Sequence, residues 1–112
     1  MKLHYRMLFP LPLLLLPLLL AFGKGDVAKG KTVFGRCAVC HGNSGEGNDA
    51  IGKALGVKIP ALGSRDVQQL DDAALKKVIL EGKGKMQAVK LSDEEVEDAI
   101  AFMRSLKKPS PK

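Results

Sequence analysis

The chain has 112 residues and a formal net charge of +6, and 46% of its residues are hydrophobic but only 4% are aromatic. A chain of this length forms one domain at most, and its small aromatic content leaves little side-chain mass for a core of its own. The positive charge does not indicate a nucleic-acid partner, because no stretch interleaves basic with aromatic residues in the way that binds nucleic acid.

Residues 1–23 have the layout of a secretory signal peptide. A positively charged start precedes a leucine-rich run, and Ala21-Phe22-Gly23 carries small residues at the outer two positions of a cleavage site. A membrane anchor that stays attached is the alternative, but the apolar run is shorter than the ~20 residues that span a bilayer, and it contains three prolines. We therefore predict export to the periplasm, no stable membrane span after cleavage, and a monomeric domain over residues 24–112 whose tail is flexible from residue 107 on.

A first helix is predicted after Asp26, a suitable N-cap, because helical spacing of apolar residues continues from there to residue 41. Gly30 and Gly35 interrupt this stretch, and each costs a helix about 1 kcal/mol relative to alanine. Close approach of another helix would explain Gly30. For Gly35 the sequence offers no account beyond crowding near a bound group.

Cys37-Ala38-Val39-Cys40-His41 is the most distinctive motif of the chain. On a helix, Cys40 lies three residues and His41 four residues after Cys37, so the three side chains share one face. Each thiol can add across one vinyl group of a porphyrin, and the imidazole can then reach the iron. C-x-x-C-H is the spacing of a c-type haem attachment site. The motif therefore predicts one covalent haem c, which would also supply the core that the composition lacks.

Two other interpretations of the cysteines stay open at this stage. In an oxidising compartment a lone C-x-x-C forms a short-loop disulfide, but a thioredoxin-like enzyme would place it near a βαβ pattern, and no β-rich run is present. Two cysteines and one histidine also fall short of the four ligands of a zinc site unless an acidic residue completes it.

The segment after the motif has two parts. Residues 42–49 are dense in turn formers and end the helix. Residues 50–62 are apolar without a regular period, so we expect them to line a pocket rather than to form a regular element. Within them, Pro60 restricts Ile59 to an extended backbone.

Two further helices are predicted. The first covers residues 72–81 behind an aspartate cap, buries one stripe and ends at Gly82. The second begins after Ser92, where Glu95 completes a capping box, and runs to about residue 106. The residues predicted to be buried are Ala74, Leu75, Val78 and Ile79 in the first of these helices, and Val96, Ala99, Ile100, Phe102 and Met103 in the second.

The second iron ligand can be narrowed by elimination. The only other histidine, His4, lies in the signal peptide, so two methionines remain in the mature domain. Met103 lies on the apolar face of the last helix, where methionine is usually a core residue. Met86 lies in the glycine- and lysine-rich loop 82–90 without apolar periodicity, and Met/His ligation is a standard haem arrangement. Met86 is therefore the predicted distal ligand, with an open or lysine-occupied site as the alternative.

The order of these motifs resembles class I cytochrome c, the small soluble mono-haem type of bacteria, over essentially the whole mature region. The stretches that carry the resemblance are residues 25–31 with Phe34, 37–42, 60–62, 82–86 and 98–103. It implies an all-α fold of three to four helices wrapped around one haem. This chain departs from the family's pattern because Phe34 precedes Cys37 by three residues rather than four. Gln87 also follows Met86 where many members have proline, which implies a less rigid ligand loop and a more labile iron–sulfur bond.

The resemblance also implies roles for single residues. The carbonyl of Pro60 would bind the second ring nitrogen of His41 and orient the imidazole. Gly30, Phe34 and Phe102 would form the contact at which the two terminal helices cross, which would account for the glycine.

With His41 and Met86 on the iron, no position stays open to a substrate, so the expected function is one-electron transfer rather than enzymatic catalysis. The alternative is a haem protein with an open or labile distal site that binds or senses a gas or peroxide. A dedicated peroxidase would require distal histidine or arginine acid–base groups, and the mature chain has no second histidine. The expected partners are redox proteins and the cytochrome c maturation machinery that attaches the haem.

The charge bears on the redox partners. Removal of Lys2 and Arg6 with the signal peptide lowers the net charge from +6 to +4. Lysines in segments expected to border the haem edge would steer the protein toward acidic docking patches, unless they form an ordinary solvated surface. These residues are Lys53, Lys58, Lys83, Lys85 and Lys90.

Overall fold

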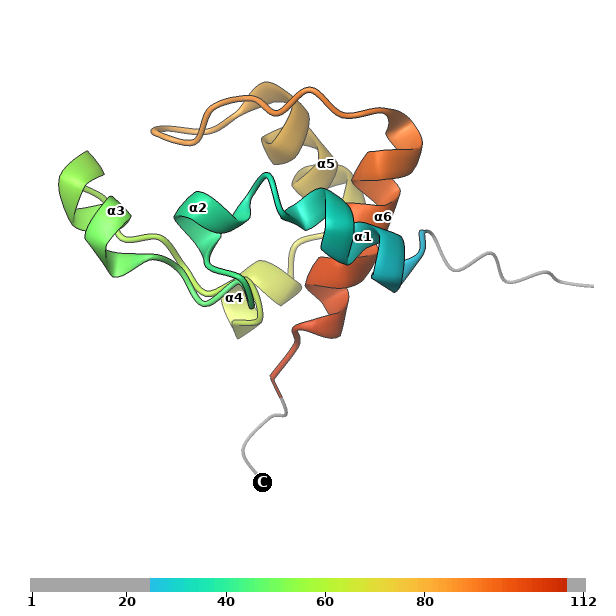
Figure 1. Cartoon of the computed structure of the whole chain (residues 1–112), viewed down its shortest axis with the longest axis horizontal. Helices are drawn as coiled ribbons and strands as arrows, with labels where there is room; N and C mark the ends of the chain where they lie inside the picture. Colours follow the sequence, from blue (N-terminus) through green and yellow to red (C-terminus); the bar gives the residue numbers. More distant parts are fainter. Residues whose placement is uncertain (1–24, 109–112) are drawn as a thin grey trace, which may run out of the picture.

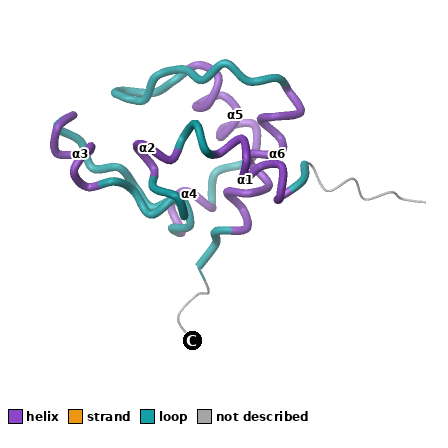
Figure 2. Tube along the Cα trace, in the orientation of Figure 1, coloured by secondary structure: helices purple, strands orange, loops and turns teal. Residues whose placement is uncertain are grey.

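The computed structural model describes residues 25–108, which form six helices and, within that part of the chain, no β-strand (Figures 1 and 2). Three longer helices build the core: α1 (Val27–Phe34), α5 (Asp72–Glu81) and α6 (Asp93–Ser105). Three short helices lie toward the other side of the molecule: α2 (Ala38–His41), α3 (Asp49–Leu55) and α4 (Arg65–Gln68). The all-α prediction is confirmed, although six helices are present where three to four were expected.

The predicted signal peptide lies outside the described residues, as do residues 109–112 of the predicted tail. The cleavage position and the domain boundary at residue 24 therefore stay predictions. Within residues 25–108, no helix is long and apolar enough to cross a membrane.

The predicted helix caps are present in the structure. Asp26, Asp71 and Ser92 each accept a hydrogen bond on the side chain from the backbone amide three residues later. The amide of Ser92 also donates a hydrogen bond to the carboxylate of Glu95 at 2.9 Å, which completes the predicted capping box. The three longer helices therefore begin where the sequence predicts, because a cap is a local interaction.

The terminal helices α1 and α6 cross in close contact. A Cβ atom on Gly30 would lie 1.9 Å from the carbonyl oxygen of Asp98, so only glycine permits this approach. Beside it, the rings of Phe34 and Phe102 meet with their centroids 5.0 Å apart. The contact predicted among Gly30, Phe34 and Phe102 is thus confirmed, and it explains the glycine inside a helix.

The hydrophobic core lies between α1, α5 and α6. Its buried residues are Phe34, Leu62, Leu75, Ile79, Val96, Ala99, Ile100, Phe102 and Met103. Met103 is therefore a core residue, as its position on the last helix predicts. Buried Asp98 accepts a hydrogen bond from the Asp26 amide at 2.7 Å, which ties the start of α1 to α6.

The expectation of one helix from Asp26 to residue 41 is wrong, because the structure breaks at Gly35. Beyond Phe34, three successive amides donate to carbonyls three residues earlier, and the Cys37 amide does so at 2.8 Å. This tighter turn offsets α2 from the axis of α1 and packs Cys37 against the core. Glycine favours the break because it has a low helix propensity.

The expectation that residues 50–62 lack regular structure is wrong for α3. The Asn48 side chain accepts hydrogen bonds from the amides of Ala50 and Ile51 and caps this helix. The helix has no apolar period because it buries only Gly52. The Asn48 cap was therefore the only local feature of the sequence that could have predicted α3. The single turn of α4 was also not predicted, and it has no buried residue.

Candidate functional site

The C-x-x-C-H motif forms a single helical turn, as predicted. Cys37 is the N-cap of α2, and its carbonyl accepts a hydrogen bond from the His41 amide at 3.0 Å. The side chains of Cys37, Cys40 and His41 are all half-buried, and both cysteines are free thiols. Two thiols and one imidazole are thus available together on one turn.

The loop that follows α2 fixes the end of this turn. The amide of Gly47 donates to the carbonyl of His41 at 2.6 Å, and the amide of Asn48 donates to that of Cys40 at 2.9 Å. The Asn48 side chain also donates to the carbonyl of Val39 at 3.1 Å. The loop therefore satisfies the carbonyl groups that a helix leaves unpaired at its C-terminal end. Sequence reasoning missed this role of Asn48.

Burial shifts the pKa values of two residues of the motif. It lowers the pKa of His41, because the charged imidazolium loses its hydration. It also raises the pKa of the Cys37 thiol, an effect that the charge of Arg36 partly opposes. The shift favours the neutral imidazole, which is the form that binds a metal ion.

The two ring nitrogens of His41 differ in their surroundings. Nδ1 is buried and has no hydrogen-bond partner within residues 25–108, whereas Nε2 is not among the buried unpartnered atoms. The predicted hydrogen bond from Nδ1 to the carbonyl of Pro60 is not formed in this structure, where Pro60 is exposed. The orienting role of Pro60 stays a prediction.

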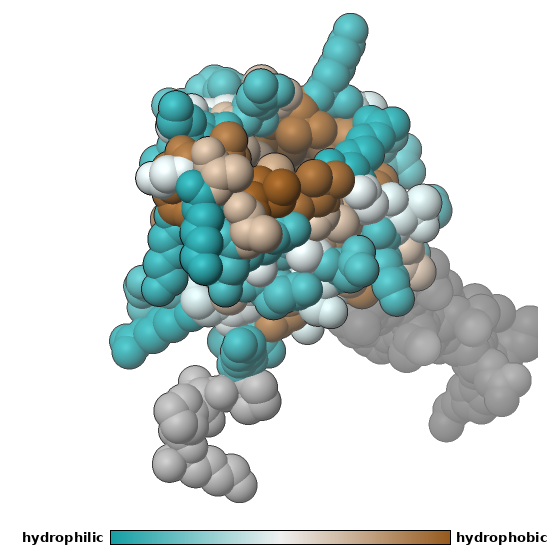
Figure 3. Space-filling model, turned by 60° about the vertical axis from the view of Figure 1, so that its left-hand side comes forward, coloured by the Kyte–Doolittle hydropathy of each residue, from teal (hydrophilic) through white to brown (hydrophobic). Residues whose placement is uncertain are grey.

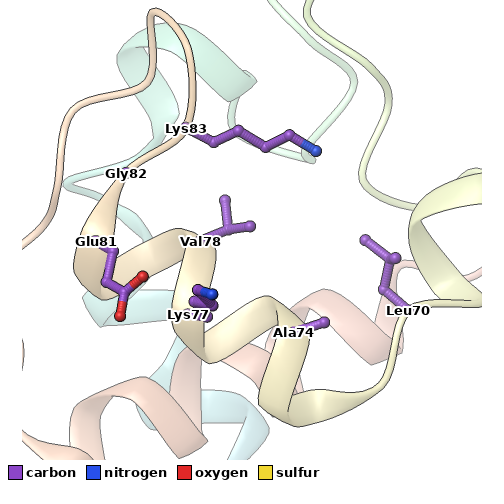
Figure 4. Close-up of a pocket in the computed structure, with 7 residues that line it drawn as sticks. All are labelled: Leu70, Ala74, Lys77, Val78, Glu81, Gly82 and Lys83. Carbon is purple, nitrogen blue, oxygen red and sulfur yellow. The ribbon is translucent and has the colours of Figure 1, made fainter.

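An apolar cavity of about 320 Å³ lies along α5 (Figure 4). We call it the α5 cavity, and its lining residues are Leu70, Ala74, Lys77, Val78, Glu81, Gly82 and Lys83. Of the four residues predicted to form one buried stripe on α5, Leu75 and Ile79 enter the core, whereas half-buried Ala74 and Val78 face this cavity. Leu70 projects into the cavity from the opposite wall, and sequence reasoning did not predict that position.

The side of the molecule that carries α3 gathers apolar residues in the middle of its face, with hydrophilic residues around them (Figure 3). Large apolar side chains are exposed in the described part of the chain at Val27, Val39, Leu55, Val57 and Leu70. Single exposed apolar residues are normal, whereas apolar residues gathered on one face are typical of a binding site for an apolar group or a partner.

Met86 lies in a tight backbone turn, residues 83–86, in the first half of the 82–90 loop. Lys83 and Met86 exchange two backbone hydrogen bonds of 2.9 Å each, and Gly84 in the turn has a φ of +57°. A Cβ atom on Gly82 would lie 2.7 Å from the Met86 carbonyl oxygen. The two glycines and the paired backbone therefore fix the backbone position of Met86, although Gln87 rather than proline follows it.

These features fit a covalently attached haem. The motif offers two thiols and an imidazole on one turn, and the α5 cavity offers an apolar wall. His41 also has a buried ring nitrogen without a hydrogen-bond partner within the described residues. The zinc alternative requires an acidic ligand near the motif. Within the described residues, no group of three or more His, Cys, Asp or Glu side chains is placed to hold a metal ion.

Comparison with known proteins adds two findings. Residues 25–103 match the family model described as cytochrome C oxidase, cbb3-type, subunit III. Among solved structures, the chain is similar to the KustC0563 c-type cytochrome, with 28% sequence identity, a TM-score of 0.60, and coverage of 70% of this chain and 98% of that chain. No curated protein matches the chain. The matched family segment contains the motif, the α5 cavity and the turn at Met86.

Proposed function

We propose that this chain, which belongs to the family of small mono-haem c-type cytochromes, carries single electrons between partner proteins in the periplasm. The chain binds haem c, and Cys37 and Cys40 have the spacing at which this family attaches it. The iron of the haem supplies a reversible change of one electron. The placement of both thiols and the His41 imidazole on one turn is the observation that carries the proposal.

Two ligands from the chain would leave no site for a substrate. The turn of α2 offers His41 through Nε2, and the paired turn at residues 83–86 offers Met86, which is half-buried. Met103 is unsuited to this role because it is 7% exposed and packed in the core. A thioether and an apolar wall both favour the reduced state of the haem. The residues around the site thus support transfer of an electron without chemistry on a substrate.

The visible spectrum of Met86→Ala tests this ligation. The variant, produced with export and haem-attachment machinery, is expected to keep covalent haem because Cys37 and Cys40 are unchanged. It should lose the methionine–iron charge-transfer band of the oxidised protein, and its reduced form should bind carbon monoxide. Met103→Leu is the matched control, and it should retain the band because Met103 serves only the core.

Three outcomes would count against the electron-carrier proposal or part of it. A band that survives in Met86→Ala would reject Met86 as the ligand. Wild-type protein with covalent haem but no band, and with ready binding of carbon monoxide, would support a protein with an open distal site instead. Wild-type protein without covalent haem would contradict the assignment to this family.

We further propose that the partners approach the α5 cavity and α3 through acidic surfaces. Lys53, Lys58, Lys83, Lys85 and Lys90 are exposed, and none of them forms an ion pair within residues 25–108. By contrast, Lys29 of α1 and Lys76 of α5 pair with Glu94 and Asp93 at the start of α6. Unpaired charge on the proposed docking face supports steering of acidic partners.

Charge reversal tests this steering. Lys83→Glu/Lys85→Glu is expected to slow oxidation of the reduced protein by an anionic oxidant such as ferricyanide by about tenfold or more at low salt. The difference should shrink at high salt, because screening weakens attraction between exposed charges. Lys107→Glu/Lys108→Glu is the matched control, because it makes the same change of charge just after α6, outside the proposed docking face. Equal slowing by both variants would reject a localised docking face.

A further inference from the structure

The connector between α4 and α5 forms one wall of the α5 cavity. It carries Leu70, whose side chain is 43% exposed because it faces the cavity rather than the core (Figure 4). The connector consists of residues 69–71, and none of the backbone hydrogen bonds outside the helices of residues 25–108 ends on the carbonyl of Gln68 or Leu70.

Arg104, in the last turn of α6, supplies hydrogen-bond donors to these two carbonyls. Its Nη1 donates to the carbonyl of Gln68 at 2.9 Å, and its Nη2 donates to the carbonyl of Leu70. Nη2 and Nε also donate to the carboxylate of Asp72, at 2.8 and 3.2 Å. One guanidinium therefore binds the last residue of α4, the middle of the connector and the first residue of α5.

Gln68, the last residue of α4, fixes the start of the same connector. Its Nε2 donates to the carbonyls of Leu62 and Met103, both at 2.9 Å. Because Met103 precedes Arg104, two consecutive residues of α6 bind the segment that carries Leu70. Lysine could not replace Arg104, because an ammonium group is a point charge whereas the guanidinium is a planar fork with five donors.

We propose that Arg104 is a positioning residue of the haem site, which places Leu70 against the haem. This inference rests on the function proposed above. Arg104 binds the backbone carbonyls of Gln68 and of Leu70 itself, so its effect on the haem passes through the Leu70 side chain. A fixed Leu70 excludes water, and an apolar environment around a haem raises its reduction potential. Release of Leu70 should therefore lower the potential.

A double-mutant cycle on the haem-loaded protein tests the proposal, with the reduction potential and the imidazole affinity of the oxidised form as readouts. Arg104→Lys keeps the positive charge but loses the fork, and Leu70→Ala removes the side chain through which Arg104 acts. Each variant should lower the reduction potential. Each should also strengthen imidazole binding by about tenfold, as expected when one contact of moderate strength is loosened. The double variant should have the same potential and imidazole affinity as Leu70→Ala, because the side chain through which Arg104 acts is then absent.

Asp72→Asn is a second variant in case Arg104→Lys does not fold. Loss of a negative charge would by itself raise the potential, whereas loosening of the connector should lower it, so a lower potential supports positioning. Arg65→Lys is the matched control because exposed Arg65 has no side-chain hydrogen bond within residues 25–108. Ser92→Ala, which removes the cap at the far end of α6, should lower stability without a change in potential.

The proposal is overturned if Arg104→Lys destabilises the fold but keeps the wild-type potential and imidazole affinity. It is also overturned if the effects of Arg104→Lys and Leu70→Ala add in full, or if Asp72→Asn raises the potential. If only the positioning role of Arg104 is wrong, the wild-type protein will still carry covalent haem and show its charge-transfer band. Absence of either from wild type would instead reject the proposed function.

Discussion

Replacement of Gly30 by alanine is expected to lower the free energy of unfolding by about 3 kcal/mol, which is a large fraction of the stability of a small domain. The added Cβ would lie 1.9 Å from the carbonyl oxygen of Asp98 and 2.9 Å from Cβ of Phe102. Both neighbours belong to α6, and the carbonyl is backbone, so α1 and α6 would have to move apart. Such a movement would also loosen the contact between Phe34 and Phe102.

Gly35→Ala is the matched control for this prediction. Gly35 is exposed, has a φ of −50°, and its added Cβ would contact only the Thr32 carbonyl oxygen, at 3.2 Å. Its free energy of unfolding should therefore change by less than about 1 kcal/mol, the difference in helix propensity between glycine and alanine. Denaturant unfolding of both haem-loaded variants measures the two effects. Similar values for Gly30→Ala and Gly35→Ala would show that the helix crossing does not limit stability.

The features that the sequence predicts correctly depend on near neighbours. The caps at Asp26, Asp71 and Ser92 follow from residues three positions apart, and the buried face of α6 follows from its period. The motif at residues 37–41 is local for the same reason, because its chemistry depends only on the spacing of side chains within one turn.

The features that the sequence does not predict depend on tertiary contacts. The period of apolar residues continues across Gly35, so it cannot reveal that the chain turns there and restarts as α2. On α5, one apolar stripe serves two surfaces, and its spacing does not distinguish Leu75 in the core from Val78 in the α5 cavity. Leu70 reaches that cavity because Arg104, more than thirty residues later, holds its backbone.

The short helices have few buried residues of their own. α2 and α4 bury none of their residues, and α3 buries only Gly52. Nearly all of the core comes from α1, α5 and α6; from the segment between α2 and α5, buried Leu62 and half-buried Val67 contribute. A domain of this size is only marginally stable without a further source of buried apolar surface. In the proposed function, the haem provides that surface beside α2 and α3.

Cys37→Ser/Cys40→Ser is therefore expected to lose the order of α2 and α3 together with the covalent haem. Amide hydrogen exchange should show loss of nearly all protection over residues 38–59, whereas amides of α1 and α6 keep measurable protection because Gly30 and the two phenylalanines still meet. Met86→Ala is the control, since it removes one proposed iron ligand but keeps both thioethers, and it should retain protection in α2. If α2 and α3 exchange as slowly in the double serine variant as in wild type, the hydrogen bonds from Gly47 and Asn48 suffice to hold the motif, and haem attachment is not what orders this half of the domain.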